Sequence, residues 1–211
     1  FAPPDQATLA RKGHLFVVAD GMGGHLAGEV ASQMAVAEVS RAYYADPGDD
    51  LAGSLERALQ AANQAIFLQG QAGAGEQGMG TTAALAVVRG REVQVANVGD
   101  SRVYLLRGAA VSQITRDHSW VEEQMRVGIL TPEQARQHPQ RNLITRALGK
   151  KSTLEPDFFS GDLRAGDVLV LCSDGLTSYV SDGEILELAG QGPPEQAVKR
   201  LVALANQRGG S

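Results

Sequence analysis

Cysteine is almost absent from this 211-residue sequence, which has Cys172 and no other. This excludes an intramolecular disulfide and a thiolate zinc site, and the apolar residues before Cys172 predict an inert, buried thiol. The sequence also lacks a basic run and has a formal net charge of −5, which argues against a surface for nucleic acid or anionic membranes. No apolar run reaches the roughly 18 residues of a membrane span, and no signal-peptide pattern opens the chain. These absences predict a soluble, intracellular protein of the cytoplasm.

Apolar residues, by contrast, make up 43% of the sequence, enough to bury a substantial core. No internal repeat or low-complexity linker divides the chain. We therefore expect one compact domain over residues 1–211, although length alone does not exclude two small ones.

Two apolar runs end in the dipeptide Asp-Gly. Residues 15–24 read LFVVADGMGG, so that Asp20 and Gly21 follow an apolar run of strand length and are followed by two more glycines. Residues 168–172 form a second such run, and Asp174 follows after one serine. One copy is equally compatible with a tight turn, because Asp-Gly is common in turns. Two strands that each carry an aspartate at the carboxyl end favour convergence on one cation.

The donors in these segments indicate which cation would suit them. Carboxylates, main-chain carbonyls and water are hard oxygen ligands, which favour Mg²⁺ or Mn²⁺ over copper, iron or zinc. The four histidines are scattered without metal-binding spacing and are expected on the surface or in loops. A third acidic candidate, Asp100, lies in the break between two extended runs, where spacing alone favours a plain hairpin turn.

Periodicity predicts two helices after the first strand, then a block of antiparallel strands, a mixed insert, another strand and two C-terminal helices. Capping-box patterns begin at Thr131 and Ser181. The glycine-rich residues 70–80 predict a mobile loop. Segregated blocks of this kind favour an α+β fold. The expected helical stripes are Val30, Met34, Ala37 and Tyr44; Leu51, Leu55, Leu59, Ala62 and Ile66; and Val198, Leu201, Val202 and Ala205. The expected strands are residues 81–89, 92–98, 102–107, 110–114, 157–163 and 168–172.

Five motifs occur together in a fixed order. They are DGMGG at residues 20–24, GTT at 80–82, NVGDSR at 97–102, TRDHS at 115–119 and SDGL at 173–176. In this order they resemble the PPM family of metal-dependent Ser/Thr protein phosphatases, the type-2C phosphatases, in its bacterial branch. The resemblance implies a four-layer α-β-β-α sandwich of two antiparallel sheets flanked by helix pairs, with a two-metal centre at one end. It also implies phosphorylated proteins, including Ser/Thr kinases, as partners of a monomer active in signal transduction.

The resemblance also assigns roles to individual residues. It implies that Asp20 bridges two Mn²⁺ or Mg²⁺ ions, that the Gly21 carbonyl and Asp174 bind metal, and that Asp100 helps to hold a weaker third ion. Residues 120–141 correspond to a mobile flap that affects substrate access, although an ordinary surface insert would have a similar sequence. A metal-activated water would hydrolyse phosphoserine or phosphothreonine without a phosphoenzyme. No general acid is assigned, because Met22 stands where many eukaryotic members have a histidine, and His25 is expected to be a cap or loop residue.

Two departures from the family pattern concern the ends of the sequence. Members usually begin with a strand that carries a phosphate-binding arginine and end with a strand that supplies another metal aspartate, and we expect both to be missing here. Such a chain would bind metal weakly, so a catalytically weak or inactive binding module is the alternative to an enzyme. Retention of Asp20, Gly21 and Asp174 favours the enzyme. A nucleotide-binding loop at residues 21–24 is disfavoured, because neither a P-loop nor a Gly-x-Gly-x-x-Gly motif is present.

Overall fold

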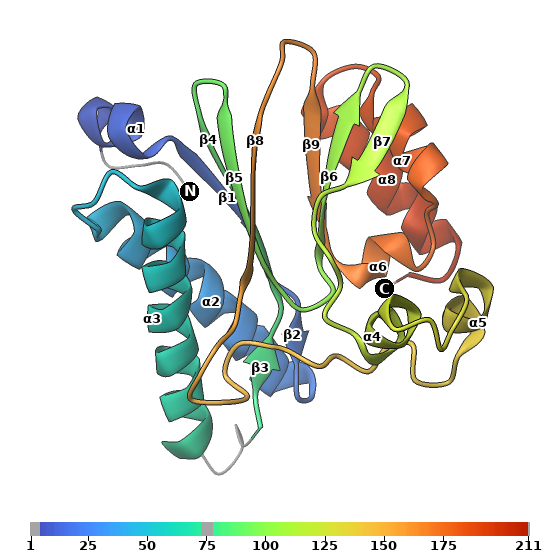
Figure 1. Cartoon of the computed structure of the whole chain (residues 1–211), viewed down its shortest axis with the longest axis horizontal. Helices are drawn as coiled ribbons and strands as arrows, with labels where there is room; N and C mark the ends of the chain where they lie inside the picture. The colour runs from blue at the N-terminus through green and yellow to red at the C-terminus, as the bar shows by residue number, and fades with distance from the viewer. Residues whose placement is uncertain (1–4, 73–77, 211) are drawn as a thin grey trace.

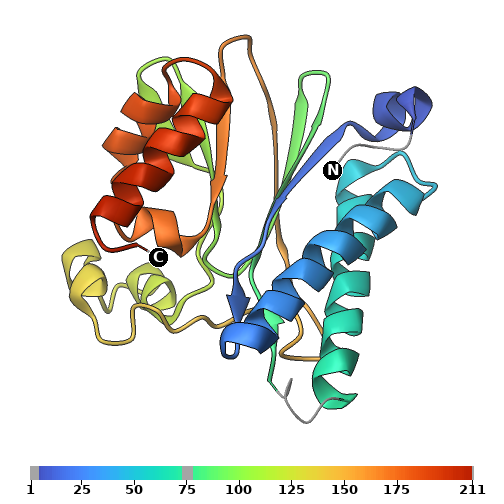
Figure 2. The same cartoon turned by 180° about the vertical axis from the view of Figure 1, so that it is seen from behind.

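The computed structural model describes residues 5–72 and 78–210 and shows two β-sheets packed face to face between helices (Figure 1). One helix pair covers the outer face of each sheet, as the view from behind also shows (Figure 2). The helices are α1 (Gln6–Lys12), α2 (His25–Ala45), α3 (Leu51–Ala72), α4 (Trp120–Arg126), α5 (Pro132–Gln137), α6 (Asp174–Thr177), α7 (Asp182–Ala189) and α8 (Pro194–Gln207). The predicted α+β sandwich is confirmed.

Both main sheets are antiparallel. The larger sheet has the order β1-β4-β5-β8, the smaller one has the order β7-β6-β9, and β2 pairs with β3 as a short ribbon. The strands are β1 (His14–Val18), β2 (Gly21–Met22), β3 (Gly80–Thr81), β4 (Ala83–Arg89), β5 (Glu92–Val98), β6 (Arg102–Arg107), β7 (Ala110–Gln113), β8 (Asp157–Asp162) and β9 (Val168–Cys172). The predicted meander is correct for the hairpins β4-β5 and β6-β7, but β5 and β6 belong to different sheets.

Three apolar cores separate the four layers. The first lies between α2, α3 and the larger sheet, the second lies between the two sheets, and the third lies between the smaller sheet and α7 and α8. Strand β4 contributes to two of them: Leu85 and Val87 face the helices, whereas Ala84 and Ala86 face the other sheet. A strand buried on both faces explains why its sequence is continuously apolar rather than alternating.

The helical stripes were predicted with different success. Every residue of the stripe expected in α3 is buried. In α2 Tyr44 is buried and Val30 and Met34 are partly buried against the core, as expected, but Ala37 is exposed. The buried row also includes Ala31, Ala35 and Val39, because small side chains let this helix pack closely on α3 and the sheet. In α8 Leu201 and Ala205 are buried as expected, but Val198 and Val202 are about half exposed.

The remaining local predictions concern two helix starts, one loop and the absence of a membrane span. The capping box at Thr131 and the one at Ser181 are both present. The loop expected over residues 70–80 is partly wrong, since α3 continues to Ala72 and β3 begins at Gly80; residues 73–77 lie outside the described part. Among the described helices, none combines the length and apolarity required to cross a bilayer.

Candidate metal centre

Asp20 lies just beyond the end of β1, and the GTT motif fixes its backbone. The Asp20 carbonyl accepts hydrogen bonds from the Thr81 hydroxyl (2.8 Å) and the Thr82 N–H (2.9 Å), and the Asp20 N–H donates to the Thr82 hydroxyl (3.0 Å). The Thr82 hydroxyl also bonds to that of Ser101 (2.7 Å). Both threonines and Ser101 are buried, which limits the access of water to these bonds. The position of Asp20 is therefore set by the neighbouring strands and not by its own turn.

Gly21 meets the backbone of another glycine. A Cβ on Gly21 would overlap the carbonyl group of Gly28 in α2, and a Cβ on Gly28 would lie 2.8 Å from the Gly21 carbonyl carbon. Only glycine at both positions permits this approach of β2 to α2. The close contact fixes the path of the chain at the carbonyl that was predicted to bind metal.

Asp174 opens α6, immediately after β9 and Ser173. Burial raises the pKa of Asp20, and the charge of Asp174 and a hydrogen bond between the two carboxyl groups raise it further; Ser173 acts in the opposite direction. The two Asp-Gly segments, one from each sheet, thus converge as expected. Their role as metal ligands stays a prediction.

Asp100 lies between β5 and β6 and joins the same acidic group. Burial, followed by the charges of Asp174, Asp117 and Asp20, raises the pKa of Asp100 to about 7. The expected plain hairpin turn at this position is wrong, because β5 and β6 do not pair and the chain crosses here from one sheet to the other. The crossing places Asp100 at the end of the sandwich where Asp20 and Asp174 lie.

The donor set of this acidic group suits a hard divalent cation. Its carboxylates are partly buried and repel one another. Burial and neighbouring carboxylates raise the pKa of Asp20 and of Asp100, and no basic side chain is among the main causes that oppose this rise. A bound cation would relieve that repulsion. Within residues 5–72 and 78–210, however, no three His, Cys, Asp or Glu side chains are close enough to hold a metal by themselves. The described side chains therefore fit a cation that also takes carbonyl and water ligands, as Mg²⁺ does.

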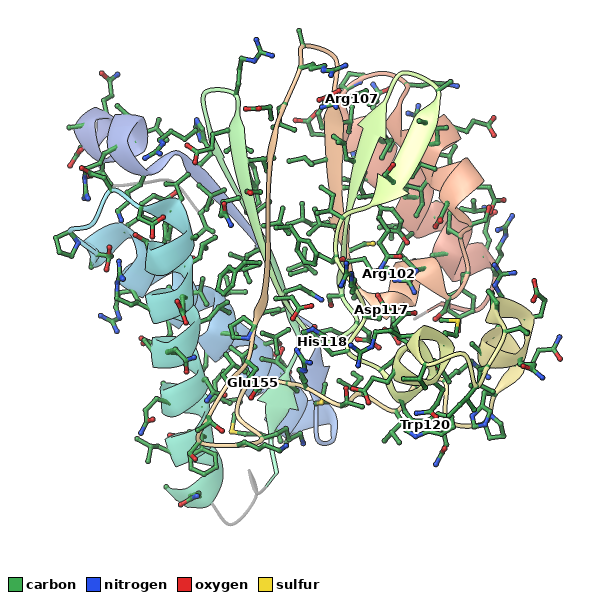
Figure 3. All side chains as sticks on the ribbon, viewed as in Figure 1. Arg102, Arg107, Asp117, His118, Trp120 and Glu155 are labelled. Atoms are coloured by element: carbon green, nitrogen blue, oxygen red, sulfur yellow. The ribbon has the colours of Figure 1, made fainter. Side chains whose placement is uncertain are left out.

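Arg102 and Asp117 form an ion pair at the edge of the acidic group, close to α6 (Figure 3). The Arg102 guanidinium donates to both carboxylate oxygens of Asp117, with distances of 2.6 to 3.0 Å, and to the Tyr104 hydroxyl at 2.9 Å. This pairing occupies the Arg102 guanidinium with partners inside the protein. The arginine of the NVGDSR motif thus joins β6 to the TRDHS motif.

A cleft of about 1170 Å³ opens beside Asp100 and Asp174. Its other wall includes α4 and α5, which make up most of the flap, residues 120–141. The flap lies beside α6 at one end of the sandwich (Figures 1 and 2). Arg136 and Arg141 of the flap line the cleft and are exposed, and neither guanidinium has a hydrogen bond or ion pair within the described residues. The cleft therefore combines an acidic floor with free positive charge on the flap side.

The remaining candidate residues are Cys172 and the histidines, and they differ in burial. Cys172 is buried as predicted, and burial raises the pKa of its thiol to about 12. His14 is exposed at the start of β1, and His138 ends α5 with its ring against Trp120. His25 is the first residue of α2, which agrees with a position near a helix cap.

His118 lies in a loop, as expected, but it is buried. It is 5% exposed, and burial followed by the charge of Arg146 lowers its pKa, so its ring is neutral near pH 7. The roles of Thr82 and Ser101 were not predicted from the sequence. A signal was available, because polar residues in otherwise apolar, strand-like segments are buried with hydrogen-bond partners.

Comparison with known proteins agrees with this geometry. The model of the family "Protein phosphatase 2C" matches residues 3–209. The Ser/Thr protein phosphatase PstP of Mycobacterium tuberculosis is 43% identical over 196 residues, which are 93% of this chain and 38% of PstP. The protein phosphatase PhpP of Streptococcus pneumoniae is 40% identical over 200 residues, which are 93% of this chain and 81% of PhpP.

A crystal structure of the PstP catalytic domain in complex with two manganese ions superposes with a TM-score of 0.84 at 41% identity, and covers 93% of this chain and 82% of that one. The chain thus spans well under half of full-length Mycobacterium tuberculosis PstP but most of this catalytic-domain structure. Since the family model covers nearly the whole sequence, and relatives at 40% identity or more share it, the chain belongs to the protein phosphatase 2C family.

Proposed function

We propose that this chain hydrolyses phosphoserine and phosphothreonine in proteins and depends on Mn²⁺ or Mg²⁺. The observation that carries the proposal is the convergence of Asp20 and Asp174 from two different sheets. A carboxylate pair without a basic partner is costly to bury unless a cation joins it. Family membership makes the phosphatase reaction the best-supported use of such a centre.

Four residues would hold the metal ions. We propose that Asp20 would be shared by two of them, that the Gly21 carbonyl and Asp174 would be further protein ligands, and that Asp100 would contribute to a weaker third ion. Two divalent cations supply an activated water at neutral pH and neutralise the charge of the phosphate. The manganese ions in the PstP catalytic domain support this choice of metal.

The chain's own residues would bind and orient the substrate. The free guanidinium groups of Arg136 and Arg141 face the cleft and would attract a phosphorylated segment. The hydrogen bonds from Thr81 and Thr82 keep the backbone of Asp20 from shifting when substrate enters. No described residue is assigned as general acid.

A phosphatase-like binding module is the second candidate. It is favoured by one observation, which is that the described side chains do not form a complete metal site by themselves. Metal dependence and the Asp20→Asn substitution distinguish the two candidates.

We expect hydrolysis of p-nitrophenyl phosphate with Mn²⁺, and loss of that hydrolysis when EDTA is added. Asp20→Asn keeps the shape of the side chain but removes the negative charge, so turnover should fall at least about a hundredfold while the circular dichroism spectrum is unchanged. The matched control is Asp162→Asn, an exposed residue of β8 that does not line the cleft. Undiminished turnover after complete chelation would contradict the metal mechanism, and a folded but inactive wild type would favour the binding module.

We also propose that the intact domain has further strands outside residues 1–211. Strands β1 and β9 are both sheet edges, and a groove of about 370 Å³ between them is lined by apolar residues such as Phe16, Val36 and Leu171. Phe16 is 51% exposed, and the buried Ser40 hydroxyl has no partner within the described residues. Edge strands of this kind accept an added strand.

A version extended at both ends to match PhpP tests this proposal. We expect the 211-residue chain to bind Mn²⁺ more weakly and to hydrolyse a phosphothreonine peptide at least about a hundredfold more slowly than the extended version. Calorimetry and single-turnover assays measure the two effects separately. Equal metal affinity and equal rates would show that added strands are not needed. Action on kinases themselves, a monomeric state and a cytoplasmic location stay predictions.

A further inference from the structure

We propose that His118 is a positioning residue, which fixes the turn at Gly99 and Asp100 and ties that turn to the base of the flap. The proposal rests on the proposed phosphatase function, because it concerns how Asp100 is held at the same cleft. The family comparison assigns no role to this histidine, and its side chain does not line the cleft. In Figure 3 His118 lies between the sandwich and the flap.

Both nitrogen atoms of the imidazole have defined partners. The Gly99 N–H donates to His118 Nδ1 at 3.2 Å, so Nδ1 carries no proton. A neutral imidazole must then carry its proton on Nε2. That nitrogen lies 3.4 Å from both Asp157 Oδ2 and Arg146 Nη1. Because a guanidinium only donates, the Nε2 proton can be accepted only by Asp157, whose other oxygen Arg146 holds at 3.1 Å. The ring therefore links Gly99 to the first residue of β8.

The backbone of His118 makes a second link, from Gly99 to the base of the flap. Its N–H donates to the Gly99 carbonyl at 2.9 Å, and its carbonyl accepts from the Thr145 N–H at 2.8 Å. The residues that follow begin the flap, and a β-bridge between Ser119 and Ile144 joins its two ends. His118 thus lies where the base of the flap meets the turn that carries Asp100.

The turn itself has little freedom to adapt. Gly99 has a φ of +101°, and a Cβ there would lie 2.6 Å from the Thr82 side chain. Thr82 contacts the turn on one side. On the other side, the His118 ring accepts a hydrogen bond from the Gly99 N–H. Because His118 is 5% exposed, water cannot replace a lost acceptor without rearrangement. Removal of Nδ1 should therefore move Gly99, and Asp100 with it.

Two substitutions separate positioning from simple packing. His118→Leu fills space but removes the acceptor, whereas His118→Asn is smaller but places its carbonyl oxygen near the position of Nδ1. The control is His14→Leu, at an exposed position of β1. We expect His118→Leu to lower kcat/KM for a phosphothreonine peptide by about tenfold, mainly through kcat, and His118→Asn to recover most of the loss.

NMR provides a readout that does not depend on turnover. Wild-type protein should show the Nε2–H tautomer of His118 and a slowly exchanging Gly99 amide. His118→Leu should accelerate Gly99 exchange at least about tenfold, while amides in the middle of α3 keep their protection. His118→Asn should preserve slow exchange at Gly99.

The outcomes separate the two proposals. A rapidly exchanging Gly99 amide in the wild type, or a His118→Leu variant with unchanged exchange and kcat/KM, would overturn the positioning role. Equal losses in both His118 variants would also overturn it, because they would indicate lost packing rather than a lost acceptor. Inactive wild-type protein with the expected tautomer and Gly99 protection would instead refute the phosphatase function.

Discussion

The floor of the cleft and the flap are held in contrasting ways. The floor is formed by the segments around Asp20, Asp100 and Asp174. Buried or partly buried hydrogen bonds of Thr82 and His118 hold the first two of these segments. The flap is joined to the domain mainly at its base, and Val127 and Ile129 within it are 60% and 64% exposed. Buried hydrogen bonds are stronger and harder to replace than exposed ones, so the two regions should respond differently to substitution.

This difference suggests a division of labour. Residues in the floor should control stability and turnover together, because a displaced strand moves a carboxylate. Residues in the flap should change the affinity for substrate and leave the fold intact. Two substitutions test this contrast, and a third, in α7, tests an ion pair outside both regions; they follow from the largest expected effect to the smallest.

Gly21→Ala should have the largest effect. The new Cβ would overlap the Gly28 carbonyl, so β2 and α2 must separate; we expect the free energy of unfolding to fall by about 2 to 3 kcal/mol, with a loss of turnover. Urea denaturation and p-nitrophenyl phosphate hydrolysis measure the two effects. Gly183→Ala is the control, because a Cβ there meets no atom within 4 Å and alanine favours the helix. If the two variants were equally stable, the close backbone contact would not constrain the floor.

Arg141→Gln should affect substrate affinity alone. It removes one free positive charge from the cleft, and we expect KM for a phosphopeptide to rise about threefold at low salt, with kcat and thermal stability unchanged. Arg126→Gln, in the exposed part of α4 and outside the cleft lining, is the matched control. A fall in kcat without a change in KM would contradict the contrast between floor and flap.

Glu184→Gln should have the smallest effect, and one that depends on pH. Hydrogen bonds from Arg208, and then from Ser181, lower the pKa of the partly exposed Glu184 carboxylate to about 2. Because the pKa of Glu184 is lower in the folded state than its unfolded value of 4.5, its carboxylate stabilises the fold at pH values above 4.5. This contribution is lost as the pH falls toward 2. The difference in Tm between wild type and variant should be greatest above pH 5 and shrink below it.

Glu187→Gln provides the reference for this measurement. Glu187 is exposed in the same helix, and its carboxylate has no ion pair or hydrogen bond within the described residues. Its Tm difference from the wild type should be small at every pH. A difference for Glu184→Gln that grows as the pH falls would show that the ion pair does not stabilise the fold.

Local pattern was sufficient to predict most elements of this fold. The stripe in α3, the strand β9 and the capping box at Thr131 depend on neighbours within a few residues, and the structure has all three where they were expected. The five ordered motifs were also sufficient for the family, because their combination is specific even though each Asp-Gly is common in turns.

Tertiary structure decided the features that depend on distant partners. Only the packing of two sheets turned the expected hairpin at Asp100 into a crossing between them, and only the contact of α2 with α3 selected Ala31 and Ala35 over Ala37 for burial. The sequence predicted a surface or loop position for His118, but not that Gly99 and Asp157 would bury its ring within that loop. Sequence spacing determines which way a side chain points from its own element, but burial also requires the element that covers it. Which element covers a side chain depends on how the whole core packs, and local sequence spacing does not determine that packing.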